Sequence, residues 1–209
     1  MKKIYLFLII LLAGTGQLLS QQLQNSDLLF VVGSDSEFSQ AIASATGGDD
    51  NLKYVHVAIL KVDNDMMQVI EADPENGVRK ITLDEFLAGA PRLSGNPGVV
   101  IKRLNADFDA DSAVANAEKH LGEPYDWLYL PDNGKSYCSE LVYESYIDEQ
   151  GHPIFQAVPM NFRNADGTMP EFWERLFRQS GMAVPEGVPG TNPQDMSKDS
   201  RLKEVLRYF

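Results

Sequence analysis

The chain contains one cysteine, Cys138, and three histidines, which are the residue types of a thiol nucleophile and its base. Cys138 begins an apolar pattern at helical spacing that continues through Leu141, Val142 and Ser145. This pattern predicts a helix over residues 137–147 with the thiol in its first turn. At that position the unpaired N–H groups of a helix favour a thiolate and can donate to an oxyanion. Taken alone, a cysteine on an apolar helix face can also be a packing residue.

His56 is the candidate base. It alternates with Val55 and Val57 in a strand-like segment, a half-buried setting that suits a tuned imidazole. His120 lies late in a predicted helix and His152 lies in a turn sequence, so neither is placed for this role. The alternative for His56 is a core histidine whose hydrogen bonds are satisfied internally.

A β-hairpin is predicted to carry His56. Residues 55–62 and 66–72 are rich in strand formers, and a turn-forming cluster separates them. With a two-residue loop at Asp63-Asn64, the residue before the loop pairs with Asp65.

In this register Glu71 lies directly opposite His56. An imidazole base needs an acceptor that fixes its tautomer, and the carboxylate of Glu71 can supply it. A one-residue slip in register would separate the two side chains and make Asp73 or Glu75 the alternative partner.

Other segments predict the elements that position these residues. Strands are indicated at residues 27–32 and 99–104. Helices are indicated at residues 36–45, stopped by Gly47-Gly48, at the capping box of residues 82–85, at residues 109–121, and after Pro170. Residues 184–200, rich in Pro, Gly, Asn and Asp, predict a loop. The mixture favours an α+β domain with a mainly antiparallel sheet.

Residues 1–20 have the charged, apolar and small-residue regions of a secretory signal peptide, with cleavage expected near Ser20 or alternatively near Gly16. Their apolar run is short for a membrane span. We therefore expect an exported protein, periplasmic or extracellular, without a stable membrane anchor. Residues 21–209 are expected to form a single domain. One cysteine in an exported chain cannot form an internal disulfide.

The formal net charge of −12 argues against a nucleic-acid-binding surface, which needs clustered Lys and Arg. The acidity keeps an exported protein soluble, and it can alternatively favour a substrate that carries a free amine. The histidines and the cysteine show no metal-ligand spacing, so we expect neither a metal nor another cofactor.

Residues 122–127 (GEPYDW) and 137–142 (YCSELV) carry a family resemblance. They resemble the nucleophile region of NlpC-type papain-like cysteine peptidases, in which Pro-Tyr-x-Trp precedes an Asp-Cys-Ser-Gly-Leu-Val helix start. In that family a His-Val-Gly-Ile strand follows the cysteine, whereas here residues 56–60 (HVAIL) precede it. The order is circularly permuted. Over residues 27–146 the chain is similar to the permuted YiiX-like branch of this superfamily.

The resemblance implies a circularly permuted papain-like fold, in which an antiparallel sheet carrying the histidine packs against the helix carrying the thiol. It implies Cys138 as nucleophile, His56 as base and Glu71 as the orienting residue.

Tyr125 matches a tyrosine that the family places near its active site. The resemblance implies that it assists the oxyanion or shapes the pocket, and a core aromatic residue is the alternative. Tyr137 and Glu140 replace the Asp and Gly of the parent family and suit the permuted branch better.

We therefore expect an exported cysteine hydrolase that cleaves an amide bond in a peptide or cell-wall-derived substrate through an acyl-enzyme. The related permuted lecithin:retinol acyltransferase group uses similar chemistry on lipid acyl groups, and a deep aliphatic groove would favour that alternative. A binding module that keeps the fold without turnover is another alternative. No oligomeric state is assigned from the sequence, and residues 185–195 are expected either to wall the cleft or to connect elements.

Overall fold

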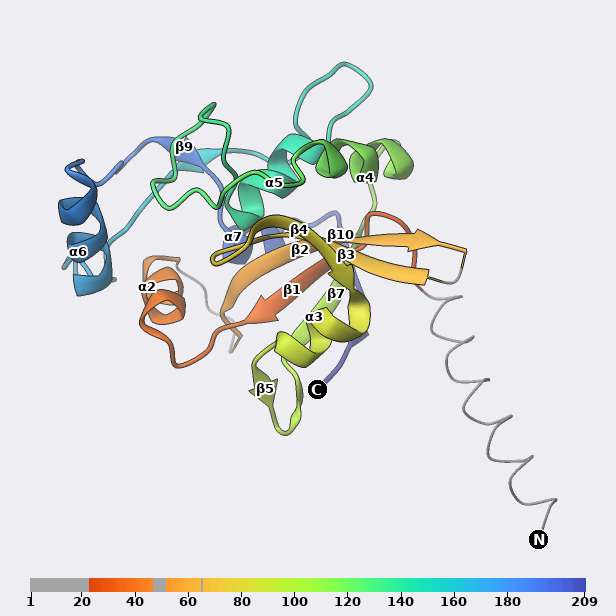
Figure 1. Ribbon diagram of the computed structural model, residues 1–209, viewed down its shortest axis with the longest axis horizontal. Coiled ribbons are helices and arrows are strands. Elements are labelled where there is room, and N and C mark those ends of the chain that lie inside the picture. The colour runs from red at the N-terminus through yellow and green to blue at the C-terminus, as the bar shows by residue number, and fades with distance from the viewer. Residues whose placement is uncertain (1–22, 47–51, 65) are drawn as a thin grey trace, which may run out of the picture.

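Figure 1 shows the computed structural model, which describes residues 23–46, 52–64 and 66–209. The expected signal peptide, the helix stop at Gly47-Gly48 and the turn residue Asp65 lie outside the described residues.

A six-stranded antiparallel sheet forms the centre of the fold, in the spatial order β10-β7-β1-β2-β3-β4. Its strands are β1 (Leu28–Val32), β2 (Tyr54–Asp63), β3 (Met66–Asp73), β4 (Gly77–Thr82), β7 (Val99–Leu104) and β10 (Leu202–Arg207). Two short pairs lie outside this sheet: β5 (Arg92–Leu93) with β6 (Asn96–Pro97), and β8 (Val158–Pro159) with β9 (Pro189–Gly190).

Helices cover both faces of the sheet (Figure 1). One face carries α4 (Ala110–Lys119) and α5 (Cys138–Ser145), and the opposite face carries α3 (Leu83–Gly89). At one end of the sheet α2 (Glu37–Ala45) packs against α6 (Glu171–Ser180), and α7 (Pro193–Ser197) packs against β2. Within the described ranges, every helix is too short or too polar to cross a membrane.

The central strand β1 is buried on both faces because helices cover both sides of the sheet. Leu28 and Phe30 belong to the same apolar cluster as Leu141 of α5. Leu29 points the other way and belongs to the cluster of Phe86 in α3. This alternation fixes the sheet between two cores, and it confirms the expected fold: the sheet that carries His56 packs against the helix that carries Cys138.

The predicted hairpin forms, but its predicted register is wrong by two residues. Val62 pairs with Met67 rather than with Asp65, and Asp63 pairs with Met66. Side chains alternate along a strand with a period of two, so a two-residue shift preserves the faces. His56 and Glu71 therefore remain on one face of the sheet and become diagonal neighbours instead of directly opposed ones.

Two edge strands, β4 and β10, are not predicted by the sequence pattern. Both carry several charged side chains, which is typical of strands at a sheet edge and hides the apolar alternation of a strand. The loop predicted for residues 184–200 is wrong in part, because it contains β9 and α7. Asn192 caps α7 by accepting the N–H of Asp195 at 2.8 Å, and Pro193 occupies the first turn.

Candidate active site

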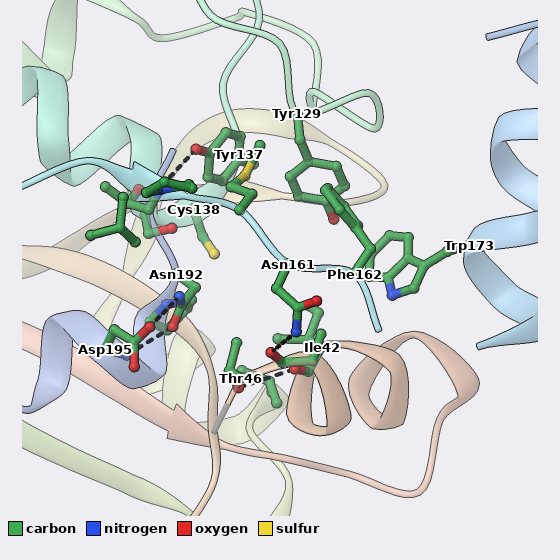
Figure 2. Close-up of a pocket in the computed structure, with 18 of the residues that line it drawn as sticks. Ile42, Thr46, Tyr129, Tyr137, Cys138, Asn161, Phe162, Trp173, Asn192 and Asp195 are labelled. Atoms are coloured by element: carbon green, nitrogen blue, oxygen red, sulfur yellow. Dashed lines mark hydrogen bonds between the residues drawn. The ribbon is translucent and has the colours of Figure 1, made fainter. Parts of the chain in front are cut away.

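Cys138 is the first residue of α5, as the sequence predicted for the thiol. Its residue surface is 4% exposed, and the carboxyl group of Glu140 accepts the N–H of Tyr137 at 3.4 Å just before the helix begins. In Figure 2 the Cys138 sulfur points into the space enclosed by the residues drawn. The free N–H groups of the first turn therefore lie beside the sulfur, where they favour negative charge.

His56 lies between Cys138 and Glu71. Its Nε2 is 2.8 Å from Glu71 Oε2, and the ring also interacts electrostatically with the Cys138 thiol. Because Nε2 is engaged by the carboxylate, Nδ1 is the ring nitrogen left for the sulfur. The ring of Phe86 stacks on the imidazole at 6.2 Å between centroids. The sheet, the thiol helix and α3 thus each contribute a contact that holds this ring.

The environment of His56 favours its charged form. Burial lowers the pKa of His56, but hydrogen bonds and charge interactions with Cys138 and Glu71 outweigh burial and raise the pKa to about 10. An imidazolium next to the sulfur stabilises a thiolate, which is the nucleophilic form of cysteine.

Glu71 is 4% exposed, and Arg79 as well as His56 binds it. Arg79 donates to Glu71 Oε1 from Nε at 3.0 Å and from Nη2 at 2.8 Å. Burial raises the pKa of Glu71, but the hydrogen bonds and charges of His56 and Arg79 outweigh it, so the net pKa is lowered. The sequence analysis missed Arg79 because it lies on the missed strand β4, where it pairs directly with Glu71.

The alternative partners, Asp73 and Glu75, do not take the place of Glu71 at the His56 ring. Asp73 is 3.3 Å from Arg79 Nη2 and accepts the backbone N–H groups of Glu75 and Asn76, which makes it a turn residue. Glu75 is exposed.

The two remaining histidines also bind other groups. His120 Nδ1 is 3.0 Å from Glu123, and the exposed ring of His152 lies 3.7 Å from Asp148. Of the three histidines, the structure brings His56 to the thiol.

Tyr125 is buried near Cys138, and its ring packs edge-on against Trp127 at 5.0 Å. Burial, followed by interactions with Tyr129, Cys138 and Tyr137, raises the pKa of Tyr125 well above its usual range. The hydroxyl is therefore a hydrogen-bond donor at every physiological pH.

Tyr129 is a residue of this site that the sequence analysis missed. Its φ of 55° lies in the left-handed region, which is unfavourable for a bulky side chain and is enriched at functional sites. The buried Asp126 imposes this conformation by accepting the N–H of Leu128 at 3.0 Å and of Leu130 at 2.7 Å. Asp126 is the residue of the sequence that could have indicated the turn around Tyr129, because aspartates favour turns of this kind.

Two cavities meet at these side chains. We call the cavity lined by Cys138 and drawn in Figure 2 the thiol pocket, and the cavity lined by His56 and Glu71 the imidazole cavity. Three residues line both cavities: Ile42, Val55 and Tyr125. A substrate can therefore extend to both sides of the thiol and the imidazole.

Residues 22–206 match the profile of the permuted papain-like amidase enzymes of the YaeF/YiiX, C92 family. The uncharacterized protein YiiX of Escherichia coli K12 is 24% identical over 192 residues, which cover 90% of this chain and 88% of YiiX.

A solved structure shares the fold. The crystal structure of YiiX from Escherichia coli O157:H7, described there as a metalloprotein, superposes with a TM-score of 0.70 at 24% identity, covering 89% of this chain and 98% of that one. The profile match over most of the chain, together with the permuted order of histidine strand and cysteine helix, shows that this protein belongs to the permuted papain-like amidase family YaeF/YiiX and is a hydrolase of the papain-like kind.

Proposed function

We propose that this protein is an exported cysteine hydrolase that cleaves an amide bond in a peptide or cell-wall-derived substrate, with Cys138 as nucleophile, His56 as base and Glu71 as the orienting residue. One observation carries the proposal: His56 binds Glu71 Oε2 at 2.8 Å and also interacts electrostatically with the Cys138 thiol. A nucleophile, a base and an acceptor that orients the base are the three parts that thiol acyl transfer requires.

The reaction begins when the Cys138 thiolate attacks the amide carbonyl carbon, with the thiol proton held on His56. The tetrahedral intermediate collapses as the C–N bond breaks and His56 gives its proton to the departing amine. The acyl group remains on the sulfur as a thioester. His56 then takes a proton from water, and the resulting hydroxide attacks the thioester, releases a carboxylic acid and restores the thiolate.

Two kinds of donor support the oxyanion of this intermediate. The backbone N–H of Cys138 belongs to the free first turn of α5, and Tyr125 supplies a protonated hydroxyl on the wall shared by both cavities. Donors fixed before the reaction stabilise developing negative charge without reorganisation.

Each of the two cavities binds a different part of the substrate. The acyl group stays bonded to Cys138, so it occupies the thiol pocket. The leaving amine must be within reach of the His56 proton, so it occupies the imidazole cavity. Arg79, which also lines that cavity, pairs with Glu71 and Asp73, and the carboxylates of Glu75 and Glu85 remain to favour a leaving group that carries a free amine.

The side chains of this site do not form a set of metal ligands. Among residues 23–46, 52–64 and 66–209, no group of three or more His, Cys, Asp or Glu side chains is arranged to hold a metal ion. His56 and Glu71 bind each other, and Arg79 occupies the other oxygen of Glu71. No step of the mechanism therefore passes through a metal.

Mass spectrometry of the intact protein after rapid quenching tests this function. During turnover of a mixture of N-acylated dipeptides, the wild-type protein should gain the mass of an acyl group on Cys138, and Cys138→Ala should gain none and cleave nothing. Cleavage by Cys138→Ala would contradict the nucleophile assignment. A wild-type protein that binds the peptides without cleavage would indicate a binding module instead.

Export is tested separately. The proposal rests on the signal-like residues 1–20, and secretion of the full chain from a bacterial host should yield a mature protein that begins close to residue 21 or residue 17. Recovery of the uncut chain in the cytoplasmic fraction would contradict it.

A further inference from the structure

Four residues that line the thiol pocket each have a buried polar atom without a hydrogen-bond partner in the described part of the chain. These atoms are Tyr129 Oη, Ser139 Oγ, Trp173 Nε1 and Thr191 Oγ1. Ser139 is 0% exposed, Trp173 2% and Tyr129 8%. Buried polar groups in folded proteins are nearly always paired with protein or with ordered water, so several unpaired ones around one pocket make it a candidate site for a ligand with hydrogen-bonding groups.

The chemistry of these atoms defines what the ligand must carry. The indole N–H of Trp173 is a donor only. The pKa of Tyr129 is raised well above its usual range, chiefly by burial, so its hydroxyl keeps its proton. The Tyr125 hydroxyl approaches Tyr129 and its own pKa is raised by that neighbour, but the two do not reach the geometry of a full hydrogen bond. The pocket therefore presents hydrogen-bond donors, and its ligand must supply hydrogen-bond acceptors.

Apolar and aromatic side chains form the rest of the wall. In Figure 2 the rings of Tyr129, Phe162 and Trp173 stand together on one side of the pocket. Their centroids are 5.3 to 5.7 Å apart with interplanar angles of 68° to 86°, so the three rings pack edge to face.

The pocket has no cation to receive an anionic ligand. Among its described lining residues there is no Lys, Arg or His, and the single carboxylate, Asp195, is already bound by Asn192 and Lys198. A charged acyl group would enter without a counter-ion, which is costly in such a site.

We infer that the thiol pocket selects a neutral acyl group that combines an apolar side chain with a hydrogen-bond acceptor, such as an N-acylated apolar aminoacyl group, and rejects a plain hydrocarbon acyl chain. The inference rests on the proposed function, because it assigns the acyl group to the pocket that contains Cys138. A hydrocarbon chain would fit the aromatic wall but would leave the indole N–H and the tyrosine hydroxyl unpaired. Sites built around such groups reject analogues that cannot pair with them.

Binding of two matched amides to Cys138→Ala protein tests the inference without any turnover. N-acetyl-leucinamide carries an acetamido oxygen as the acceptor. 4-Methylpentanamide has the same isobutyl group and terminal carboxamide but no acetamido group. Titrations monitored by ligand NMR should show that N-acetyl-leucinamide binds about tenfold more tightly than 4-methylpentanamide. That ratio corresponds to one or two net hydrogen bonds. Adding Trp173→Phe or Tyr129→Phe should bring the ratio close to one and leave 4-methylpentanamide unaffected.

Tyr208→Phe is the matched control, because Tyr208 packs on the opposite face of the sheet and does not line the pocket. It should leave the ratio unchanged. The inference would be overturned if the two amides bind equally, if neither binds, or if decanamide binds more tightly. It would also be overturned if the ratio of the two affinities survives both Trp173→Phe and Tyr129→Phe. Each of these outcomes is separable from failure of the proposed function, because alkylation of Cys138 and capture of its acyl adduct are measured on wild-type protein and do not depend on this preference.

Discussion

Arg79 lies directly opposite Glu71 across β3 and β4, and its guanidinium donates two hydrogen bonds to Glu71 Oε1. This arrangement leaves Oε2 for the imidazole of His56. Arg79 is therefore a positioning residue: its ion-pair partners are the carboxylates of Glu71 and Asp73, and it fixes the Glu71 carboxylate that orients the imidazole and keeps that carboxylate ionised.

Arg79→Gln should lower the rate of Cys138 alkylation about tenfold, because it removes a charge-assisted pair that holds Glu71. The pKa of Glu71 should rise toward its ordinary value, so reactivity should begin to fall at a higher pH as the solution is acidified. The measurement is the alkylation rate between pH 4 and pH 8. Arg178→Gln, which changes an exposed arginine on α6, should leave the profile unchanged.

Asp126→Ala should reduce the free energy of unfolding by ~2 kcal/mol, because two backbone N–H groups lose a buried acceptor. The loop around Tyr129 should also lose its fixed conformation. Urea denaturation measures the first effect. Asp107→Ala, at an exposed position, should change stability by less than ~0.5 kcal/mol. A loss no greater than that of this control would contradict the role given to Asp126.

Glu140 should make the protein less stable at alkaline pH. Burial, followed by the charge of Glu144, raises the pKa of Glu140 to about 8. The folded state therefore holds this proton more tightly than the unfolded state, and the associated stability is full below pH 4.5 and is lost as the pH rises toward 8.

Glu140→Gln removes this titration and keeps an oxygen that can accept the N–H of Tyr137. The variant should be at least ~1 kcal/mol more stable than wild type at pH 8, with the difference shrinking toward pH 5. Urea midpoints at both pH values measure it, and Glu174→Gln on α6, a half-exposed site, serves as control. A difference that does not depend on pH would show that Glu140 is ionised in the folded protein throughout.

Glu75→Gln should raise KM two- to threefold for an amide whose leaving group carries a free amine, because it removes one exposed carboxylate from the imidazole cavity. A matched amide with a neutral leaving group should be unaffected. Added salt should shrink the difference between the substrates in the wild-type enzyme. Equal effects on both substrates would contradict the preference for an amine.

Local patterns were sufficient to predict the main helices and the central strands. The helix that begins at Cys138 and the strand that carries His56 both have clear apolar periodicity, and both appear where that periodicity places them. The hairpin register was not predictable to the residue, because a two-residue change leaves the alternation of faces intact.

Arg79 and Tyr129 were beyond local reasoning for different physical reasons. Arg79 acts through pairing between β3 and β4, and β4 is an edge strand with a charged sequence. Tyr129 adopts a left-handed backbone that the carboxylate of Asp126 holds in place, a tertiary effect that overrides the preference of tyrosine.

The pH dependence of Cys138 alkylation by iodoacetamide tests the central claim most directly. If His56 and Cys138 form an ion pair, wild-type Cys138 should react rapidly at pH 6, well below the range in which a free thiol ionises, and Glu71→Gln should weaken that reactivity. His56→Ala should abolish the fast reaction at pH 6 and leave only the slow reaction of a buried thiol at higher pH. An inert Cys138 in the folded protein, or a His56→Ala variant that reacts as fast as wild type at pH 6, would contradict the account.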